Sequence, residues 1–191
     1  SEEVLAVDDI LIENDTLAAY LENEVTHTLM GRFGNTMLVN GDTDYDLIVD
    51  KNEVVRFYIT NAANTRVFNL EIPGAKMKLV GSDNGLYEQD EWTEEILLSP
   101  SERAIVEVFF AEAGDYDLVH ETPDRTYTLG QISVSDQEVA QSYAEDFDKH
   151  HIHSQVISSI DPYRSSFNKE PDRLLSIDLE MDSMGGMHSM H

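Results

Sequence analysis

Two stretches of the sequence carry side chains that could bind a metal ion, and the first is a group of histidines. His150 is followed directly by the His-x-His sequence His151-Ile152-His153. In an extended segment the side chains at positions i and i+2 point to the same side, so two imidazoles could share one divalent cation. We therefore assign His151 and His153 as candidate ligands of an adventitiously bound metal. The same residues also suit a solvated linker that holds no ligand.

The second stretch is the C-terminal tail, residues 181–191. Its candidate ligands are Met184, Met187, His188, Met190 and His191. Thioethers favour Cu(I), and imidazole accepts either copper oxidation state. The tail is therefore a candidate contact for Cu(I) or Cu(II). A linker of accidental composition, or the remnant of a cloning tag, explains the same residues without copper.

The composition excludes several kinds of chemistry. The chain has 191 residues, seven histidines and no cysteine. Without cysteine it cannot hold a disulfide framework, a zinc ribbon, a thiol nucleophile or a blue copper centre, which needs a thiolate ligand. We find no Ser/His/Asp order, P-loop or dinucleotide fingerprint, and carboxylates are too abundant for any pair to be informative. The sequence therefore assigns no catalytic and no cofactor-binding residue, and His27 and His120 are predicted to be ordinary loop or sheet-surface histidines.

The charge balance is strongly acidic. The chain has 38 Asp and Glu residues against 12 Lys and Arg residues, a formal net charge of -26. Such a charge argues against binding to a nucleic-acid backbone or an anionic membrane, and no apolar run approaches the roughly 18–20 residues needed to span a bilayer. The charge fits a solubilising surface, an adaptation to high salt, or the attraction of cations. The acidic start, Ser1-Glu2-Glu3, lacks the plan of a signal peptide, so we expect a mature product or an excised fragment.

The elements that would position these groups are mostly strands. Turn signals recur at short spacing, and the runs between them are rich in β-branched and aromatic residues, which is typical of a sandwich or barrel. Alternation predicts that Val55, Phe57 and Ile59 share one buried face, and that Val106 and Val108 do the same. The predicted strands lie near Asp9–Ile12, Thr36–Val39, Tyr45–Val49, Val54–Asn61, Val67–Ile72, Met77–Ser82, Thr93–Leu98, Arg103–Phe110, Asp115–His120 and Tyr127–Val134.

The sequence changes character after Val134. Ser135 and Glu138 have the spacing of a capping box, which predicts a short helix through about Phe147. The polar stretch 148–170 is predicted to be a linker. Leu174–Leu179 is predicted to be one more strand without a partner, and the tail after it cannot form a core. The predicted layout is an opening strand and long loop at 1–29, a β-sandwich at 30–135, a helix and linker at 136–170, and a truncated strand with its tail at 171–191.

Three stretches of the predicted sandwich carry motifs known from other proteins. Residues 33–41, F-G-N-T-M-L-V-N-G, are similar to the motif G-D-T-I-L-V-N-G, with Asn35 in place of the usual Asp. Residues 55–66, V-R-F-Y-I-T-N-A-A-N-T-R, resemble Y-R-F-R-V-I-N-A-S-N-T-R. Residues 80–86 and 98–103, V-G-S-D-N-G-L and L-S-P-S-E-R, resemble I-G-S-D-G-G-L and L-A-P-A-E-R. In this order the motifs resemble the second domain of a family, the multicopper oxidases of the laccase-like and spore-coat types.

Both flanks also resemble the family. Residues 9–15 look like the strand that opens its middle domain, and residues 171–177 look like the first strand of its third domain. The resemblance implies an all-β, cupredoxin-like Greek-key sandwich with a short helix and a C-terminal extension. In such a domain Arg56, Arg66 and Arg103 would tie loops to carboxylates or backbone carbonyls.

The resemblance also implies a function for a parent protein. Members of the family reduce O2 at a copper cluster held by eight histidines from the first and third domains, and they oxidise phenol-like donors or metal ions. The middle domain carries no copper ligand. We therefore expect a non-catalytic scaffold segment with flanking cupredoxin domains as its partners, outside the cytoplasm or in a spore coat. The alternative is a stand-alone copper-binding or chaperone module that uses the Met/His tail.

Overall fold

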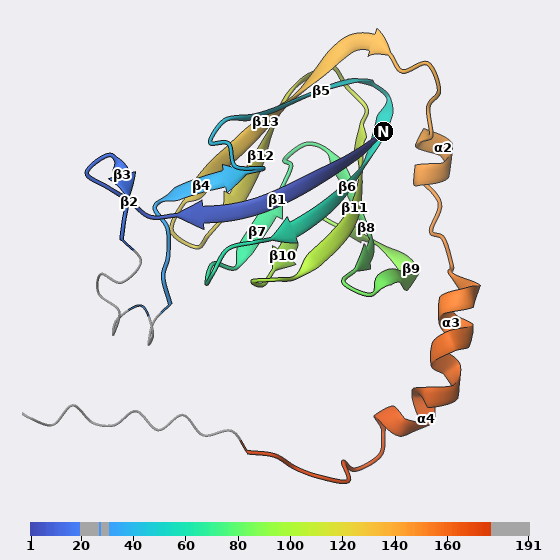
Figure 1. Ribbon diagram of the computed structural model, residues 1–191. Coiled ribbons are helices and arrows are strands. Elements are labelled where there is room, and N and C mark those ends of the chain that lie inside the picture. Colours follow the sequence, from blue (N-terminus) through green and yellow to red (C-terminus); the bar gives the residue numbers. More distant parts are fainter. Residues whose placement is uncertain (20–26, 28–30, 177–191) are drawn as a thin grey trace, which may run out of the picture.

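The computed structural model describes residues 1–19, 27 and 31–176, and most of these residues form a sandwich of two mixed β-sheets (Figure 1). The first sheet contains, in spatial order, β4 (Thr36–Val39), β1 (Glu2–Ile10), β6 (Glu53–Asn61), β11 (Arg103–Phe110), β8 (Lys76–Ser82) and β9 (Gly85–Thr93). The second contains β10 (Ile96–Leu98), β7 (Phe68–Glu71), β12 (Gly114–Glu121), β13 (Thr126–Glu138) and β5 (Tyr45–Lys51). A small hairpin joins β2 (Ile12–Glu13) to β3 (Thr16–Leu17).

The core lies between the sheets, where alternation along the strands places the apolar side chains. In the antiparallel pair of β6 and β11, Phe57 is opposite Val106 and Val55 is opposite Val108. All four side chains are buried, as is Ile59, so the predicted phase of both strands is confirmed. Each large apolar side chain removed from water in this way contributes roughly 1.5–3 kcal/mol.

The predicted loop contacts of Arg66 and Arg103 are present, whereas Arg56 pairs with Glu107 on the neighbouring strand β11 rather than with a loop. Arg66 donates from Nε to the buried carboxylate of Asp9 at 2.8 Å and from Nη2 to the carbonyl of Gly34 at 2.8 Å. The same carboxylate accepts the Gly34 amide at 2.6 Å. Arg103 donates to Asp83 at 3.1 Å, in the turn between β8 and β9. These contacts fasten loops to strands at the rim of the sandwich.

Three strands differ from their predictions. β1 begins at Glu2 rather than near Asp9, and it pairs with β4 and, in parallel, with β6. β9 was not predicted, because its centre, residues 88–91, is acidic and amide-bearing, a composition that is depleted in strands. The strand predicted at Thr93–Leu98 forms only at β10. The strands of the sandwich thus extend from Glu2 to Glu138, a wider range than 30–135.

The helix predicted from the capping box is wrong over most of its length. β13 continues to Glu138 because it pairs in parallel with β5, and Ser135 lies opposite Asp50. The Ser135 hydroxyl donates to the Asp50 carboxylate at 2.8 Å instead of capping a helix. Only α2 (Ala144–Phe147) remains of the predicted helix.

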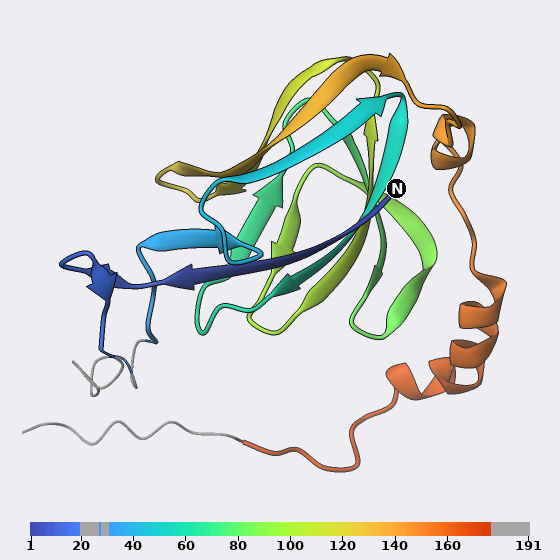
Figure 2. The ribbon, with the colours of Figure 1, turned by 45° about the horizontal axis from the view of Figure 1, so that its top comes forward.

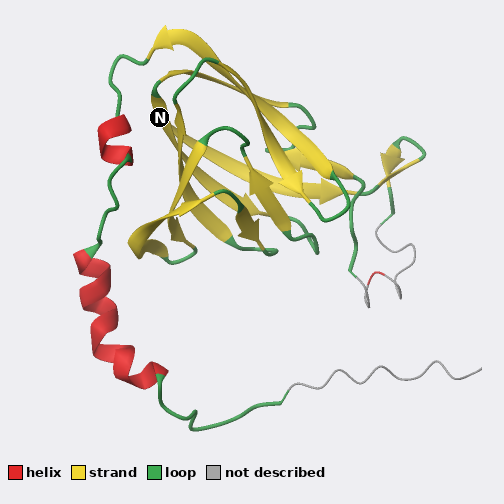
Figure 3. Ribbon diagram, turned by 180° about the vertical axis from the view of Figure 1, so that it is seen from behind, coloured by secondary structure: helices red, strands yellow, loops and turns green. Residues whose placement is uncertain are grey.

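The predicted linker at 148–170 contains helices. After α2 the chain forms α3 (Ser154–Ile160), a 3-10 turn η1 (Asp161–Tyr163) and α4 (Arg164–Phe167). Figures 2 and 3 show these helices following one side of the sandwich rather than covering a sheet. Leu174 and Leu175 belong to no strand and are exposed. Ser176 is likewise in no strand, and residues 177–179 of the strand predicted at Leu174–Leu179, with the whole tail, lie outside the described residues.

Within the described ranges, no helix combines the length and the apolar character needed to cross a membrane.

Candidate functional site

A buried lysine marks the most unusual place in the structure. Strand pairing aligns Arg56, Glu107, Lys78 and Trp92 in a row across β6, β11, β8 and β9. The row lies on the outer face of the first sheet, because Phe57, Val106 and Met77, the neighbours in sequence, point into the core. An outer face is normally wet, yet Lys78 has 0% of its surface exposed. Something other than the sheet must therefore cover it.

The cover is the chain that follows β13. The Lys78 ammonium donates to the carbonyls of Phe147 at 2.9 Å and of Lys149 at 3.2 Å. It also lies 3.2 Å from the Glu107 carboxylate and 3.4 Å from that of Asp90. The rings of Phe147 and Trp92 face it, with centroids at 5.0 and 5.7 Å. Ion pairing, hydrogen bonds and cation–π contacts together offset the cost of removing the ammonium from water.

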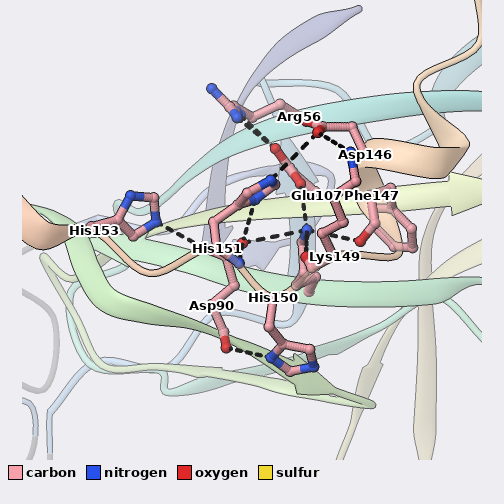
Figure 4. Close-up of polar contacts among 10 residues, drawn as sticks. Arg56, Asp90, Glu107, Asp146, Phe147, Lys149, His150, His151 and His153 are labelled. Atoms are coloured by element: carbon pink, nitrogen blue, oxygen red, sulfur yellow. Dashed lines mark hydrogen bonds and ion pairs between the residues drawn. The ribbon is translucent and has the colours of Figure 1, made fainter.

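Asp90 of β9 is the second centre of this cluster (Figure 4). The Asp90 side chain is 1% exposed. One carboxylate oxygen lies 2.9 Å from Nδ1 of His151 and accepts the His151 amide at 3.2 Å, while the other lies 3.0 Å from Nε2 of His153. Burial by itself raises the pKa of Asp90. The hydrogen bonds from His153 and His151 and the charge of Lys78 outweigh burial and hold that pKa below its ordinary value.

Backbone contacts complete the docking of this segment. The Asp90 amide donates to the His151 carbonyl at 3.2 Å, and the His153 amide donates to the Glu88 carbonyl at 2.8 Å. Gln89 and Ile152 form an antiparallel bridge. The chain therefore adds a very short strand to the open edge of β9, which is one way to protect a sheet edge.

The structure thus brings His151 and His153 together, on one carboxylate. Across residues 1–19, 27 and 31–176, no group of three or more His, Asp and Glu side chains is arranged to hold a metal ion. A metal bound at Nδ1 of His151 and Nε2 of His153 would displace their contacts with Asp90 and lie close to the Lys78 ammonium, which repels it. The candidate ligands Met184, Met187, His188, Met190 and His191 lie outside the described residues.

Sequence reasoning missed Lys78, Asp90 and Glu107. Asp90 and Glu107 are two of 38 acidic residues, so their residue type does not distinguish them from acidic residues on the surface. Lys78 was detectable in principle, since it is one of only 12 cationic residues and it interrupts an apolar strand. Alternation nevertheless predicts an exposed side chain there, and the covering segment comes from a distant part of the chain.

His120 is another buried polar group, and its prediction as a loop or surface histidine is wrong. It is 2% exposed, and its ring stacks on Tyr127 and packs against Phe68. The Asn69 amide donates to Nδ1 at 3.0 Å, while Nε2 is buried without a hydrogen-bond partner in the described part of the chain. Burial lowers the pKa of His120, although the contact of Nδ1 with the Asn69 carbonyl at 3.2 Å acts in the opposite direction.

Comparison with known proteins identifies the class. The family model described as "Multicopper oxidase" matches residues 9–140. The laccase-like multicopper oxidase CueO from Ochrobactrum sp. is 25% identical, with a TM-score of 0.65 over 74% of this chain and 32% of that chain. The Campylobacter jejuni multicopper oxidase, a metallo-oxidase, is 31% identical, with a TM-score of 0.61 over 72% of this chain and 31% of that chain. No curated protein matches the chain.

The fold is therefore that of a multicopper oxidase cupredoxin domain, as predicted. The chain belongs to the multicopper oxidase family. It spans about a third of the length of the solved structures it matches.

Related enzymes of this family hold copper, and the described residues of this chain do not suit a redox copper centre. The sequence has no cysteine for a blue centre. His151 and His153 are committed to Asp90 beside a buried ammonium, which already supplies the positive charge that this carboxylate requires. The arrangement can recognise and hold a chain segment.

Proposed function

We propose that this chain is the non-catalytic middle domain of a three-domain multicopper oxidase, followed by the beginning of the third domain. The observation that carries the proposal is a cupredoxin sandwich of the family without a thiolate and with its His-x-His pair bound to Asp90. A domain of this kind acts as a spacer, and its partners are the flanking cupredoxin domains.

The chemistry belongs to the parent enzyme. There, copper supplies the four-electron reduction of O2 to water, coupled to the oxidation of phenol-like donors or metal ions. Two similar proteins support these two donor classes. The Ochrobactrum enzyme has oxidase activity towards lignin model compounds, and the Campylobacter enzyme is a metallo-oxidase. An extracytoplasmic or spore-coat location follows from the same family resemblance.

The proposal is tested by oxygen uptake. The chain is loaded with copper and given a phenolic donor, with the Ochrobactrum enzyme as a positive control. We expect no uptake above free copper and no blue absorption band. Copper-dependent turnover by this chain would overturn the scaffold role, and so would a parent gene without a downstream His-Cys-His run.

A second candidate function rests on the composition of the tail. A stand-alone copper-binding or chaperone module would use Met184, Met187, His188, Met190 and His191. Competition with a chromophoric Cu(I) chelator tests it. Tight binding that disappears when the three methionines become leucine supports the module, and binding no stronger than that of the variant rejects it.

A further inference from the structure

We propose that residues 147–153, called here the exit segment, are a latch that docks on a receptor formed by Lys78 and Asp90, and that this latch fixes the direction in which the chain leaves the sandwich. The latch deepens the proposed scaffold role. Only its consequence in the parent enzyme rests on that role. A flexible linker is the alternative.

The receptor is built around a charge that needs the exit segment. Two of the four oxygens around the Lys78 ammonium are backbone carbonyls of the segment, those of Phe147 and Lys149. If the segment left, the ammonium and the Asp90 carboxylate would keep only each other, Glu107 and water. A fully buried lysine is rare unless it is paired, so its position has a physical reason only when the segment is docked.

The segment also carries its own recognition groups. The spacing of His151 and His153 in an extended chain lets both imidazoles reach the two oxygens of Asp90. Phe147 is buried and packs edge-on against Trp92 at 5.1 Å between centroids, and His150 packs against the same indole at 5.4 Å. Charge, hydrogen bonding and aromatic packing thus select one register, which the bridge between Gln89 and Ile152 fixes.

The latch joins the two sheets. The chain leaves β13 of the second sheet, and the exit segment then binds β9, the edge strand of the first sheet. Further along, Arg164 of α4 pairs with Glu88 of β9. Figure 1 shows the resulting path down one side of the sandwich. A domain that follows would therefore start from a fixed position beside β9, as a spacer between two domains requires.

Limited proteolysis of the full chain with trypsin tests the latch. The Lys149 side chain is exposed, but its backbone is held in the latch, so cleavage there requires local opening. Lys169 and Arg173 are exposed beyond α4 and serve as internal references. We expect cleavage at both references well before cleavage at Lys149. In Lys78→Met we expect cleavage at Lys149 to accelerate by about tenfold or more, with unchanged rates at the references.

The only tryptophan gives an independent readout. Trp92 contacts Phe147 and His150, so its emission should shift to the red when the segment undocks. The His151→Ala/His153→Ala variant should behave as Lys78→Met does, with the far-ultraviolet circular dichroism of the sandwich retained. Lys76→Met is the matched control, because Lys76 is an exposed lysine of the same strand that reaches Asp148 only at 3.8 Å. It should change neither readout.

Three results would overturn the latch. Cleavage at Lys149 as fast as at Lys169 in the unaltered protein would mean that the segment is not docked. Protection of Lys149 with unchanged Trp92 emission in both variants would mean that the named groups do not hold it. Global unfolding of both variants would make the segment part of the core rather than a separable latch. None of these outcomes depends on copper or on the parent enzyme, so they are distinct from failure of the scaffold role.

Discussion

Phe57 and Lys78 are both removed from water, at 1% and 0% exposure, but by different means. Phe57 is covered by the opposite sheet, because β6 alternates and places every second residue between the sheets. Lys78 faces outward and is covered by one segment from a distant part of the chain. The degree of burial alone therefore does not show how much of the fold depends on a residue.

This difference governs what a substitution can cost. Removing a core side chain leaves a cavity that neither sheet can close. Removing an outer polar group leaves unpaired partners, but these can return to water if the covering segment lifts. The cost at the outer cluster is therefore limited by the free energy of local opening.

The largest expected effect is that of Phe57→Ala. It should lower the free energy of unfolding by roughly 3–5 kcal/mol, as for other large truncations in cores. Urea denaturation followed by circular dichroism measures it. Ile48→Ala is the control, since Ile48 is an apolar strand residue that is 79% exposed, and it should stay within about 0.5 kcal/mol of the unaltered protein. Equal effects of the two substitutions would mean that the strand phase is wrong.

Lys78→Met should cost less, about 1–3 kcal/mol, the usual penalty for leaving buried polar partners unsatisfied. Without local opening, breaking a buried pair would cost roughly 3–5 kcal/mol. The same denaturation experiment, with Lys76→Met as the control, measures the difference. A loss as large as that of Phe57→Ala would remove the distinction between the two regions.

The sequence predicts the inner region well and the outer region poorly. Val55, Phe57 and Val106 lie in alternating apolar strands, where period and side-chain type agree, so their burial could be read directly. The outer cluster depends on which distant segment covers Lys78, and no local pattern contains that information.

Two local signals were outweighed by pairing with distant strands. Ser135 and Glu138 suit a helix start, but β5 offers parallel backbone hydrogen bonds to the same residues. The acidic residues of β9 disfavour a strand, but that strand pairs with β8 on one side and with the chain at Ile152 on the other. Within the candidate site, the sequence predicted only that His151 and His153 lie side by side, because they are two residues apart in an extended segment.

His120 provides a third, smaller test, because it is a titratable group buried in the sandwich away from the Lys78 cluster. Its folded pKa lies below the ordinary value of 6.5, so the unfolded chain binds more protons in that range. The stability due to this effect is complete above the unfolded pKa and is lost as the pH falls through the folded pKa.

Urea denaturation measures the free energy of unfolding of the unaltered protein and of His120→Gln from pH 8 to pH 5. This range includes the unfolded pKa of about 6.5. Arg66, Glu121 and Asp9 also act on this imidazole and are common to both proteins. The stability difference between the two proteins should shrink as the pH falls. A difference that is constant with pH would mean that His120 titrates as it does in the unfolded chain.

The smallest expected effect is the change that salt makes in the difference between the thermal midpoints of the unaltered protein and Lys78→Met. With a net charge of -26, sodium chloride should raise the thermal midpoint of both proteins by screening repulsion between surface carboxylates. The buried contacts of Lys78 are screened much less. The difference between the two midpoints should therefore stay nearly constant across the salt series, and a difference that vanishes at high salt would mean that the cluster is solvent-accessible. A midpoint that does not rise at all would rule out adaptation to high salt.

Native-state hydrogen exchange of Lys78→Met tests most directly the claim that the core and the outer cluster are separable. The His153 amide, bonded to Glu88, reports on the exit segment, and the Val106 amide in β11 reports on the core. We expect His153 to exchange much faster than Val106 in the unaltered protein, and Lys78→Met to leave His153 almost unprotected while Val106 stays protected. Equal protection of the two amides, in either protein, would mean that the exit segment opens only when the core unfolds.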